Sequence, residues 1–460
     1  MSAPPNRQLE QLQALEREAD QARAQQQTAR ALNLYIQLSL RAPNHWPAYY
    51  WIGRLMSDIN RPVAALTALR RAAAIAPEQS GVLVAMALAF NINGEHSQAV
   101  DVLRRAVALD PANLHARFNL AEMLLRMNEI EEALTRFDDI VEGPQDADNI
   151  RAISRWLRAV ARLTLGDYQA AWDDYEARVD HPTTTFPTLE GELWCGQPLQ
   201  GKRVFLAYEQ RFGDVIQFSR FVPRLTEQGA TVILQTPHEL LRLFESLGQG
   251  TELIEYKDAK PAYDYCQLVT SIPAVMNYAR EDVWRGPYLD TQPEVTTRPL
   301  PMRPGTRLKV GLVWAGKPIP NRSIPLKQLA PLLRQRDVSF YSFQLGEERE
   351  QAKALGVDWL IHDLSDRITD FHDSSCLMKQ MDLMITIDTA AAHQAGAMGL
   401  PVWLLLIYYS DWRWGAYRDD HTAWYPNTRI FRQHEMDSWR QLSRDLDTAF
   451  ERWIDEKVAE

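Results

Sequence analysis

The sequence has few cysteines and no long apolar run. The three cysteines, Cys195, Cys266 and Cys376, are scattered and lack metal-ligand spacing, so we expect neither a disulfide scaffold nor a metal site. The apolar run 401–409 is among the longest, and it falls far short of the roughly 18 residues that span a bilayer. The first residues also lack the apolar segment of a secretory signal. These absences predict a reduced, cytoplasmic protein with no transmembrane segment.

Basic residues are outnumbered, and lysine is missing from a large part of the chain. The 50 Lys and Arg stand against 60 Asp and Glu, which gives a formal net charge of −10. This balance argues against a protein built to grip nucleic acid, and we expect no nucleic-acid partner. The first lysine is Lys202, which indicates a domain boundary close to that residue. A chain of 460 residues, 46% of them hydrophobic, is long enough for two to four domains.

A period of 34 residues runs through the first part of the chain. It is carried by three prolines, by four alanines and by four bulky residues that follow the alanines: Pro43, Pro77 and Pro111; Ala31, Ala65, Ala99 and Ala133; Tyr35, Leu69, Leu103 and Phe137. The small residue lets paired helices approach, the bulky one fills their core, and proline blocks continuation of a helix. The pattern resembles the tetratricopeptide repeat, and a looser last unit is expected as two helices over 152–165 and 168–178.

Stacked helix pairs form a curved α-solenoid with a concave groove, because one pair cannot bury its faces alone. We therefore expect a tetratricopeptide-repeat array over residues 1–180. Its groove would bind a protein or peptide, through exposed candidates on the first helices: Tyr49, Arg54, Asn119 and Arg126. Two alternatives stay open, a generic helical bundle and an array that only supports the next domain.

After Lys202, short apolar strands alternate with helical segments. We expect strands at 203–208, 231–235, 253–256 and 265–269, a proline-rich linker at 296–305, and strands at 309–314, 338–343, 383–387 and 401–406. Helices are expected at 213–225, 238–247, 326–334, 347–355, 371–381, 391–398 and 437–458. This alternation predicts an α/β fold of two Rossmann-like halves over 181–297 and 298–435, with a closing helix in 436–460. The cleft between the carboxyl ends of their strands is the default active site.

Two strand-end loops in the second half carry groups that suit a phosphate. Asp388 and Thr389 stand at a helix start with His393 one turn later, and a helix N-terminus attracts a nucleotide diphosphate. Asp388 and Thr389 could instead cap the helix, and His393 could be a core histidine. Lys317 and Arg322 could neutralise a departing diphosphate, or form a solvated basic loop.

The loop after the first strand of the first half offers a carboxylate at Asp214. A carboxylate facing across the cleft could deprotonate an acceptor hydroxyl as a general base. The alternative interpretation is that Asp214 caps a helix.

Together these loops resemble bacterial glycosyltransferases of the lipopolysaccharide heptosyltransferase type (glycosyltransferase family 9-like), which have the two-domain GT-B fold. The chain is more closely similar to tetratricopeptide-repeat proteins that carry such a domain. Their signature, Asp-Trp-Arg-Trp followed by Trp-Tyr-Pro, matches 411–414 and 424–426, and the resemblance covers about 30–455. It implies an inverting, metal-independent glycosyltransferase that uses a nucleotide-sugar donor, a hydroxyl acceptor and no cofactor.

The resemblance also implies roles for individual residues. Asp214 matches the catalytic base. The donor and nucleotide side comprises Lys317, Arg322, Ser323, Gln344, Glu347 (or Glu348), Asp388, Thr389, Ala390 and His393. Candidate acceptor or sugar contacts are Glu209, Gln210, Gln217, Asp411 and Trp412. The chain departs from the family pattern where Arg211 and Phe212 replace Gly-Leu and where Ala390 replaces glycine.

A repeat array ahead of a transferase predicts a protein acceptor. We expect Ser or Thr of a surface or filament protein such as flagellin to be recruited by the array. A lipopolysaccharide or other glycan acceptor is the first alternative. The second is a scaffold whose transferase domain is inactive, and the departures at Arg211, Phe212 and Ala390 motivate it.

Overall fold

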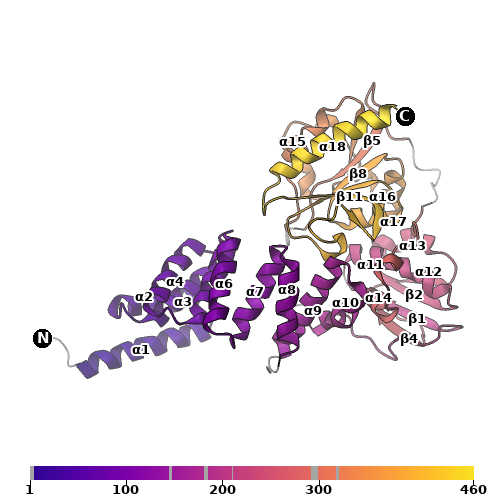
Figure 1. Ribbon diagram of the computed structural model, residues 1–460. Helices are drawn as coiled ribbons and strands as arrows, with labels where there is room; N and C mark the ends of the chain where they lie inside the picture. The colour runs from indigo at the N-terminus through magenta and orange to yellow at the C-terminus, as the bar shows by residue number, and fades with distance from the viewer. Residues whose placement is uncertain are drawn as a thin grey trace. The chain divides into compact units, whose positions relative to one another are not determined.

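The computed structural model describes residues 5–143, 148–180, 185–209, 211–291, 299–317 and 321–459. The chain divides into two compact units, Met1–Ala161 and Arg162–Glu460 (Figure 1). Within the described residues, no helix is both long and apolar enough to cross a bilayer.

The first unit is a series of antiparallel helix pairs. Its helices are α1 (Pro5–Ala24), α2 (Thr28–Arg41), α3 (Trp46–Asp58), α4 (Pro62–Ile75), α5 (Ser80–Ile92), α6 (His96–Leu109), α7 (Leu114–Arg126), α8 (Ile130–Val141) and the first turns of α9 (Asp148–Leu165). Each of α1 to α7 packs on the next helix, and α3, α5 and α7 also contact one another in turn. The predicted solenoid-like helical array is therefore confirmed.

The periodic residues of the array form its core, as the sequence predicts. The four alanines are fully buried, and so are Tyr35, Leu69, Leu103 and Phe137. Gly53 shows how tight the pairing is, since a Cβ there would lie 2.4 Å from the Leu69 Cγ. Close approach of α3 and α4 therefore requires glycine at this position.

The second unit begins with the last turn of α9, followed by α10 (Tyr168–Tyr175) and a 3₁₀ turn, η1 (Glu176–Asp180). A four-stranded parallel sheet follows in the order β3-β2-β1-β4. Its strands are β1 (Arg203–Ala207), β2 (Thr231–Thr236), β3 (Thr251–Glu255) and β4 (Tyr265–Leu268). The short helices of this half are α11 (Phe212–Phe218), α12 (Val222–Thr226), α13 (Leu241–Phe244) and α14 (Ile272–Val275).

A seven-stranded sheet in the order β10-β11-β9-β8-β5-β6-β7 forms the other half of this unit. Its strands are β5 (Leu308–Val313), β6 (Val338–Ser342), β7 (Ile361–Asp363), β8 (Leu383–Ile387), β9 (Val402–Leu406), β10 (His421–Thr422) and β11 (Tyr425–Arg432). Numbered within this half, the six parallel strands run 3-2-1-4-5-6, which is the order of a doubly wound sheet. Its helices are α15 (Gln351–Ala354), α16 (Phe371–Met378), α17 (Ala390–Ala397) and α18 (Arg440–Ala459).

The long helix α18 lies against this second sheet (Figure 1). Leu446 and Phe450 of α18 join one hydrophobic core with strand residues such as Val310, Phe340 and Trp403. The parallel sheets that the alternating pattern predicts are therefore present in both halves.

Some elements differ from the expectation. The segment 326–334 forms two 3₁₀ turns, η7 (Leu326–Gln328) and η8 (Leu332–Arg334), because Pro331 lacks the N–H that a continuous helix needs. The strands β7, β10 and β11 were not predicted. In β11, Pro426 and Asn427 interrupt the apolar pattern that marks a strand.

The division between the units falls at 161/162, whereas the sequence predicts an array that ends at residue 180. The physical reason is the packing of α10. The Trp172 indole donates to the Tyr278 carbonyl over 2.8 Å, and α10 packs on α14. The helix expected to close the array is thus a part of the α/β unit.

Candidate functional site

The predicted site residues follow the carboxyl ends of strands beside the points where strand order reverses. In the second sheet, β5 and β8 are parallel neighbours on either side of that point. Lys317 lies in the loop after β5, and Asp388 follows β8 directly. Ligands of doubly wound sheets bind in the crevice at this place. In the first sheet, β1 and β4 are the corresponding pair, and Asp214 lies in α11, after β1.

Asp388 is buried and paired with Arg322, whose Nη1 donates to the Asp388 Oδ2 over 2.6 Å. Burial raises the pKa of Asp388, and the negative charge of Asp411 adds to this effect, although Arg322 acts to lower it. Thr389 is the N-cap of α17, yet its side chain makes no capping hydrogen bond. The first-turn N–H groups of α17 therefore lack a side-chain cap from Thr389, which suits an anion.

His393 lies inside α17 and is enclosed by aromatic side chains. Its Nδ1 is 2.9 Å from the Tyr425 hydroxyl, and its ring stacks on Trp414 at 5.0 Å between centroids. Burial lowers the pKa of His393 to about 3, with a further contribution from the positive charge of Arg413. The imidazole is therefore neutral at neutral pH and occupies a core position.

Glycine at 213 allows α11 of the first half to approach α17 of the second. A Cβ at this position would lie 2.9 Å from the His393 Cδ2, closer than carbon atoms pack. The helix that carries Asp214 therefore meets the helix that follows Asp388.

Arg413 connects the two halves. Its Nη2 donates to the Asp214 Oδ1 over 3.0 Å, its Nη1 to the Asp411 Oδ1 over 2.9 Å, and its Nε to the buried amide oxygen of Gln217. Burial acts to lower the pKa of Arg413, but the carboxylates of Asp411 and Asp214 outweigh it and raise that pKa. The same guanidinium lowers the pKa of Asp411 against the opposing effect of burial. The Arg413 guanidinium thus forms hydrogen bonds with three of the predicted site residues.

Several predicted site residues form hydrogen bonds within the local framework. The Gln344 side chain accepts hydrogen bonds from the backbone N–H groups of Trp314 and Ala315 and donates to two carbonyls, which holds the end of β5. The Ser323 Oγ accepts from the Gly316 N–H over 3.1 Å. The Glu209 carboxylate accepts from the Thr270 N–H and hydroxyl.

The remaining predicted residues lie in different surroundings. Lys317 and Glu347 (with Glu348) are exposed, and Ala390 is half-buried at the first position of α17. Trp412 is only 3% exposed and packs within an aromatic cluster. Gln210 lies outside the described residues.

Sequence reasoning assigned no role to Arg413, Tyr425 or Arg220. Arg220 is buried, donates to the Trp424 carbonyl over 2.9 Å and lies 4.7 Å from the centre of the Tyr425 ring. Arg413, Trp424 and Tyr425 all belong to the Asp-Trp-Arg-Trp and Trp-Tyr-Pro signature. The signature therefore marked these residues in the sequence, but it did not indicate that they make contacts between the two halves.

A separate hollow of about 620 Å³ lies in the first unit. It is lined mainly by α3, α5 and α7, and its polar side chains include Tyr50, Arg54, Asn91, Asn113, His115, Asn119, Glu122 and Arg126. Arg126 is paired with Glu122 at 2.7 Å, whereas Arg54 donates to the Tyr50 hydroxyl over 3.2 Å. Three of the four groove residues predicted from the sequence line this hollow, and Tyr49 does not.

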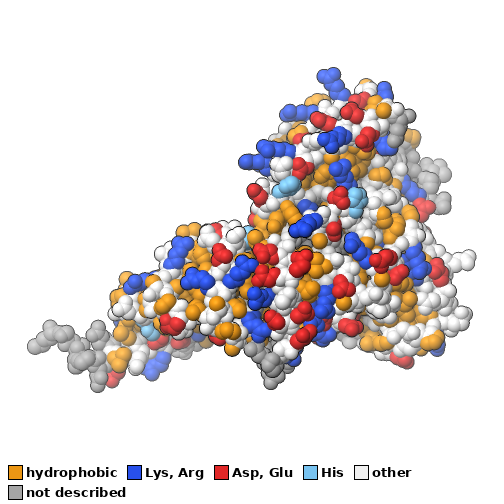
Figure 2. Space-filling model, viewed as in Figure 1, with side chains coloured by type: hydrophobic (Ala, Val, Ile, Leu, Met, Phe, Trp, Pro, Cys, Tyr) orange, Lys and Arg blue, Asp and Glu red, His pale blue; other side chains and the backbone are white. Residues whose placement is uncertain are grey.

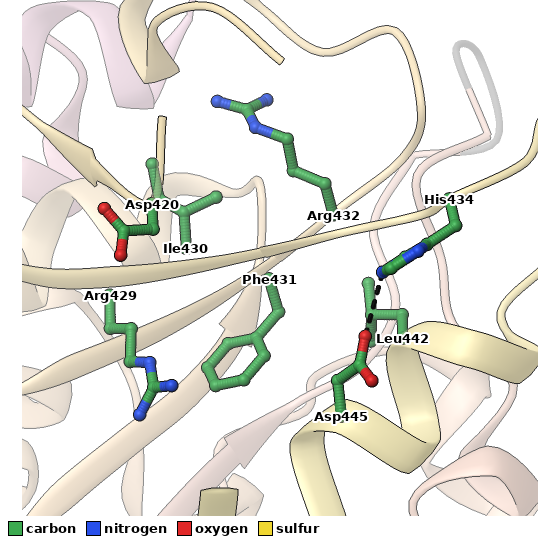
Figure 3. A pocket seen from close by; sticks show the side chains of 8 residues that line it. All are labelled: Asp420, Arg429, Ile430, Phe431, Arg432, His434, Leu442 and Asp445. Carbon is green, nitrogen blue, oxygen red and sulfur yellow. Dashed lines mark ion pairs between the residues drawn. The ribbon is translucent and has the colours of Figure 1, made fainter. Parts of the chain in front are cut away.

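Two other features contain none of the predicted site residues. A hollow of about 210 Å³ beside β11 and α18 contains the ion pair of His434 and Asp445 at 2.8 Å (Figure 3). Asp370, His372 and Asp373 form a cluster with metal-ligand spacing, but Arg242 pairs with both carboxylates at 2.9 and 3.2 Å. That cluster is best described as an ion-pair network. Over the face seen in Figure 2, basic and acidic side chains are interspersed.

Comparison with known proteins supports the repeats. Family models described as tetratricopeptide repeat match residues 16–80 and 92–157, which confirms the repeats. Protein FlbA of Caulobacter vibrioides is 25% identical over 428 residues, a similarity that covers 86% of this chain and 71% of FlbA. Because of its length, this similarity extends well beyond the repeats into the α/β unit.

Solved structures also resemble part of the chain. YrrB, described as a TPR protein with an unusual peptide-binding site, is 20% identical with a TM-score of 0.31, covering 35% of this chain and 81% of YrrB. PilF of Pseudomonas aeruginosa is 16% identical with a TM-score of 0.35, covering 39% of this chain and 79% of PilF.

Proposed function

We propose that the protein is an inverting glycosyltransferase of the GT-B type, which moves a sugar from a nucleotide-sugar donor to a hydroxyl acceptor. The observation that carries this proposal is the meeting of two strand-end loops across the halves. Asp214 of the first half is held by Arg413 of the second, while α11 packs against α17, the helix that follows Asp388. The proposed base thus lies on a helix that contacts α17, and the start of α17 would bind the anion at the strand ends where doubly wound sheets bind ligands.

In this proposal Asp214 acts as the general base. Arg413 occupies the Asp214 Oδ1, so the Oδ2 takes the proton of the acceptor hydroxyl. The acceptor oxygen bonds to the anomeric carbon of the sugar as the bond from that carbon to the phosphate oxygen breaks. The nucleoside diphosphate leaves with the bonding electrons, and the anomeric configuration inverts.

The leaving diphosphate would be stabilised by the start of α17 with Arg322 and Lys317. Arg322 is about one-third exposed, while its partner Asp388 is buried. The ion pair therefore orients the Arg322 guanidinium and leaves part of it accessible to a ligand. Preorganised donors of this kind contribute about 2.7–4 kcal/mol each to a developing anion in known enzymes. The proposed mechanism requires no metal ion.

For the acceptor, we propose a protein modified on Ser or Thr, such as flagellin. The groove of the first unit supports this part of the proposal. Its walls offer the Arg54 guanidinium and the Asn119 amide beside apolar side chains such as Leu88, a mixture that suits an extended peptide. A glycan acceptor and an inactive scaffold are outcomes that the experiments below would reveal.

The first test is calorimetry of the full-length protein with a panel of nucleotides and nucleotide sugars. A bound nucleotide sugar followed by sugar transfer supports the proposal, and mass spectrometry of proteins from cells with and without the gene then identifies the acceptor. A glycan mass lost from lipopolysaccharide alone would favour the glycan acceptor. Absence of binding across the panel would favour the scaffold.

The sharpest variant is Asp214→Asn. The amide oxygen can still accept from Arg413, so the local geometry is retained while the base is removed. We expect turnover to fall by about 10²–10⁴-fold, with nucleotide affinity unchanged. Asp388→Ala is the control on the donor side, since loss of the carboxylate that accepts from Arg322 releases this arginine and should weaken nucleotide binding. Near-normal turnover of Asp214→Asn would exclude Asp214 as the base.

A further inference from the structure

The α10 helix presents three aromatic side chains to the loop that carries Arg413. Trp412 lies 6.4, 6.5 and 5.9 Å, between ring centroids, from Tyr168, Trp172 and Tyr175 of α10. Trp424 closes the cluster at 5.8 Å from Trp412. Trp412 is therefore enclosed on several sides by edge-to-face aromatic contacts.

The α10 helix is itself fixed to the half that contains Asp214. Trp172 donates to the Tyr278 carbonyl over 2.8 Å. In the turn after α10, the Arg178 Nη2 donates to the hydroxyls of Thr270 and Ser271 over 2.8 and 2.7 Å. These contacts are largely buried, so they hold the aromatic face of α10 in one place relative to the first sheet.

The segment around Trp412 is tightly folded. The Asp411 Oδ1 accepts from the backbone N–H of Arg413 over 3.0 Å and caps the 3₁₀ turn η12 (Trp412–Trp414). The Arg413 guanidinium lies 4.5 Å from the centre of the Trp412 ring. The Trp412 ring is therefore in direct contact with the guanidinium that donates to Asp214.

We propose that Trp412 is a positioning residue, seated by α10, which fixes Arg413 and through it the Asp214 carboxylate. The inference rests on the proposed function, in which Asp214 is the base. It assigns Trp412 a role other than the sugar or acceptor contact that the sequence suggested, because its ring is almost wholly covered by protein. It also makes the last helix before the first sheet a determinant of turnover.

The kinetic test uses the full-length protein and its sugar-transfer reaction. Trp412→Ala and Trp172→Ala should lower kcat by about 10–100-fold, the scale expected when a reacting group is displaced by about 1 Å. The KM for the donor should change by less than about twofold, because the start of α17 and Arg322 are untouched. Trp412→Phe, which restores an aromatic ring, should recover most of the lost kcat.

Trp403→Ala is the matched control. Trp403 is a buried tryptophan of the same half, and it packs on Phe431, Phe450 and Trp453 instead of the Arg413 loop. It should lower the melting temperature and leave kcat within about twofold. The inference is overturned if Trp403→Ala lowers kcat as much as Trp412→Ala, or if Trp412→Phe recovers nothing.

A second measurement needs no activity and separates this inference from the proposed function. If Trp412 holds Arg413 on Asp214, then Asp214→Asn should shift the urea midpoint less in the Trp412→Ala background than in the wild type. Equal shifts in both backgrounds would overturn the positioning role, whichever reaction the protein catalyses. A wild-type protein that transfers no sugar, with unequal shifts, would refute the proposed function and leave the positioning role standing.

Discussion

At the scale of single residues, His393 links burial to pH dependence. Its pKa in the folded protein is about 3 because burial disfavours the charged ring, whereas an exposed histidine has a pKa near 6.5. As the pH falls from about 6.5 toward 3, the unfolded chain binds a proton that the folded protein does not. The folded state therefore loses up to about 1.4 kcal/mol per pH unit through this group across that window.

His393→Gln removes this titration and keeps a polar group beside Tyr425. We expect the variant to be less stable than wild type at pH 7, because the stacking on Trp414 is lost. The difference between the two unfolding free energies should then shrink as the pH falls from 6.5 to 4. Urea unfolding at several pH values measures this convergence. Parallel pH curves would mean that His393 is protonated in the folded protein.

Gly213 offers a second prediction at this scale. In Gly213→Ala the added Cβ meets the His393 ring at 2.9 Å, so α11 must shift away from α17. We expect a loss of about 1–3 kcal/mol in stability, and a loss of turnover because Asp214 moves with α11. The control is Gly81→Ala in the first turn of α5, where a Cβ meets nothing within 4 Å; its stability should stay within about 0.5 kcal/mol of the wild type. Equal stability changes in the two variants would contradict the close approach of the helices.

The site residues divide according to whether a local pattern could reveal them. Asp388 and Asp214 are recognisable because the end of a strand and the start of a helix both leave periodic signals close by. The bond from Arg413 to Asp214 joins residues 199 positions apart, and no local pattern records such a contact. Burial leaves no local signal in the sequence either, so it did not indicate that Trp412 and Gln344 are buried or that Gln344 holds the end of β5.

At the scale of elements, α10 shows that a helical sequence pattern can continue past the end of a repeat array. Its sequence continues the helical pattern of the array, yet its buried aromatic residues pack on Trp412 and Trp424 of the α/β unit. The strands were more predictable, because most of the eight expected ones are apolar runs between turn signals. The strand β11 was not predicted, because its polar residues break the apolar pattern. Its backbone is held in a strand by parallel pairing with β9.

The packing of α10 predicts where the chain can be shortened. A chain that begins at residue 148 keeps α9 and α10 and should fold cooperatively with its nucleotide affinity intact. A chain that begins at residue 181 loses Trp172 and the other α10 aromatics, and removal of one such buried ring costs about 3–5 kcal/mol. We expect the shorter chain to aggregate or to melt at a much lower temperature. Circular dichroism melting of both chains decides this, and equal melting would refute a structural role for α10.

At the scale of the whole molecule, the proposal assigns acceptor recruitment to the array and chemistry to the α/β unit. The two roles can be separated, because slow hydrolysis of the donor, in which water takes the sugar, needs no acceptor protein. A change in the groove should therefore alter protein modification and spare donor turnover. Arg54 and Asn119 are the side chains to change, since both line the groove and neither belongs to the helix-pair core.

We expect the double variant Arg54→Ala, Asn119→Ala to raise the KM for the acceptor protein about tenfold or more, since arginine is enriched among the few interface residues whose truncation costs about 2 kcal/mol or more. Its rate of donor hydrolysis and its melting temperature should match the wild type. Arg105→Ala is the control, because Arg105 is an exposed arginine of α6 outside the groove. Kinetics with purified acceptor and with donor alone provide both measurements. If the groove variant modifies the acceptor as efficiently as Arg105→Ala does, the array does not recruit it, and the acceptor must be recognised by the α/β unit.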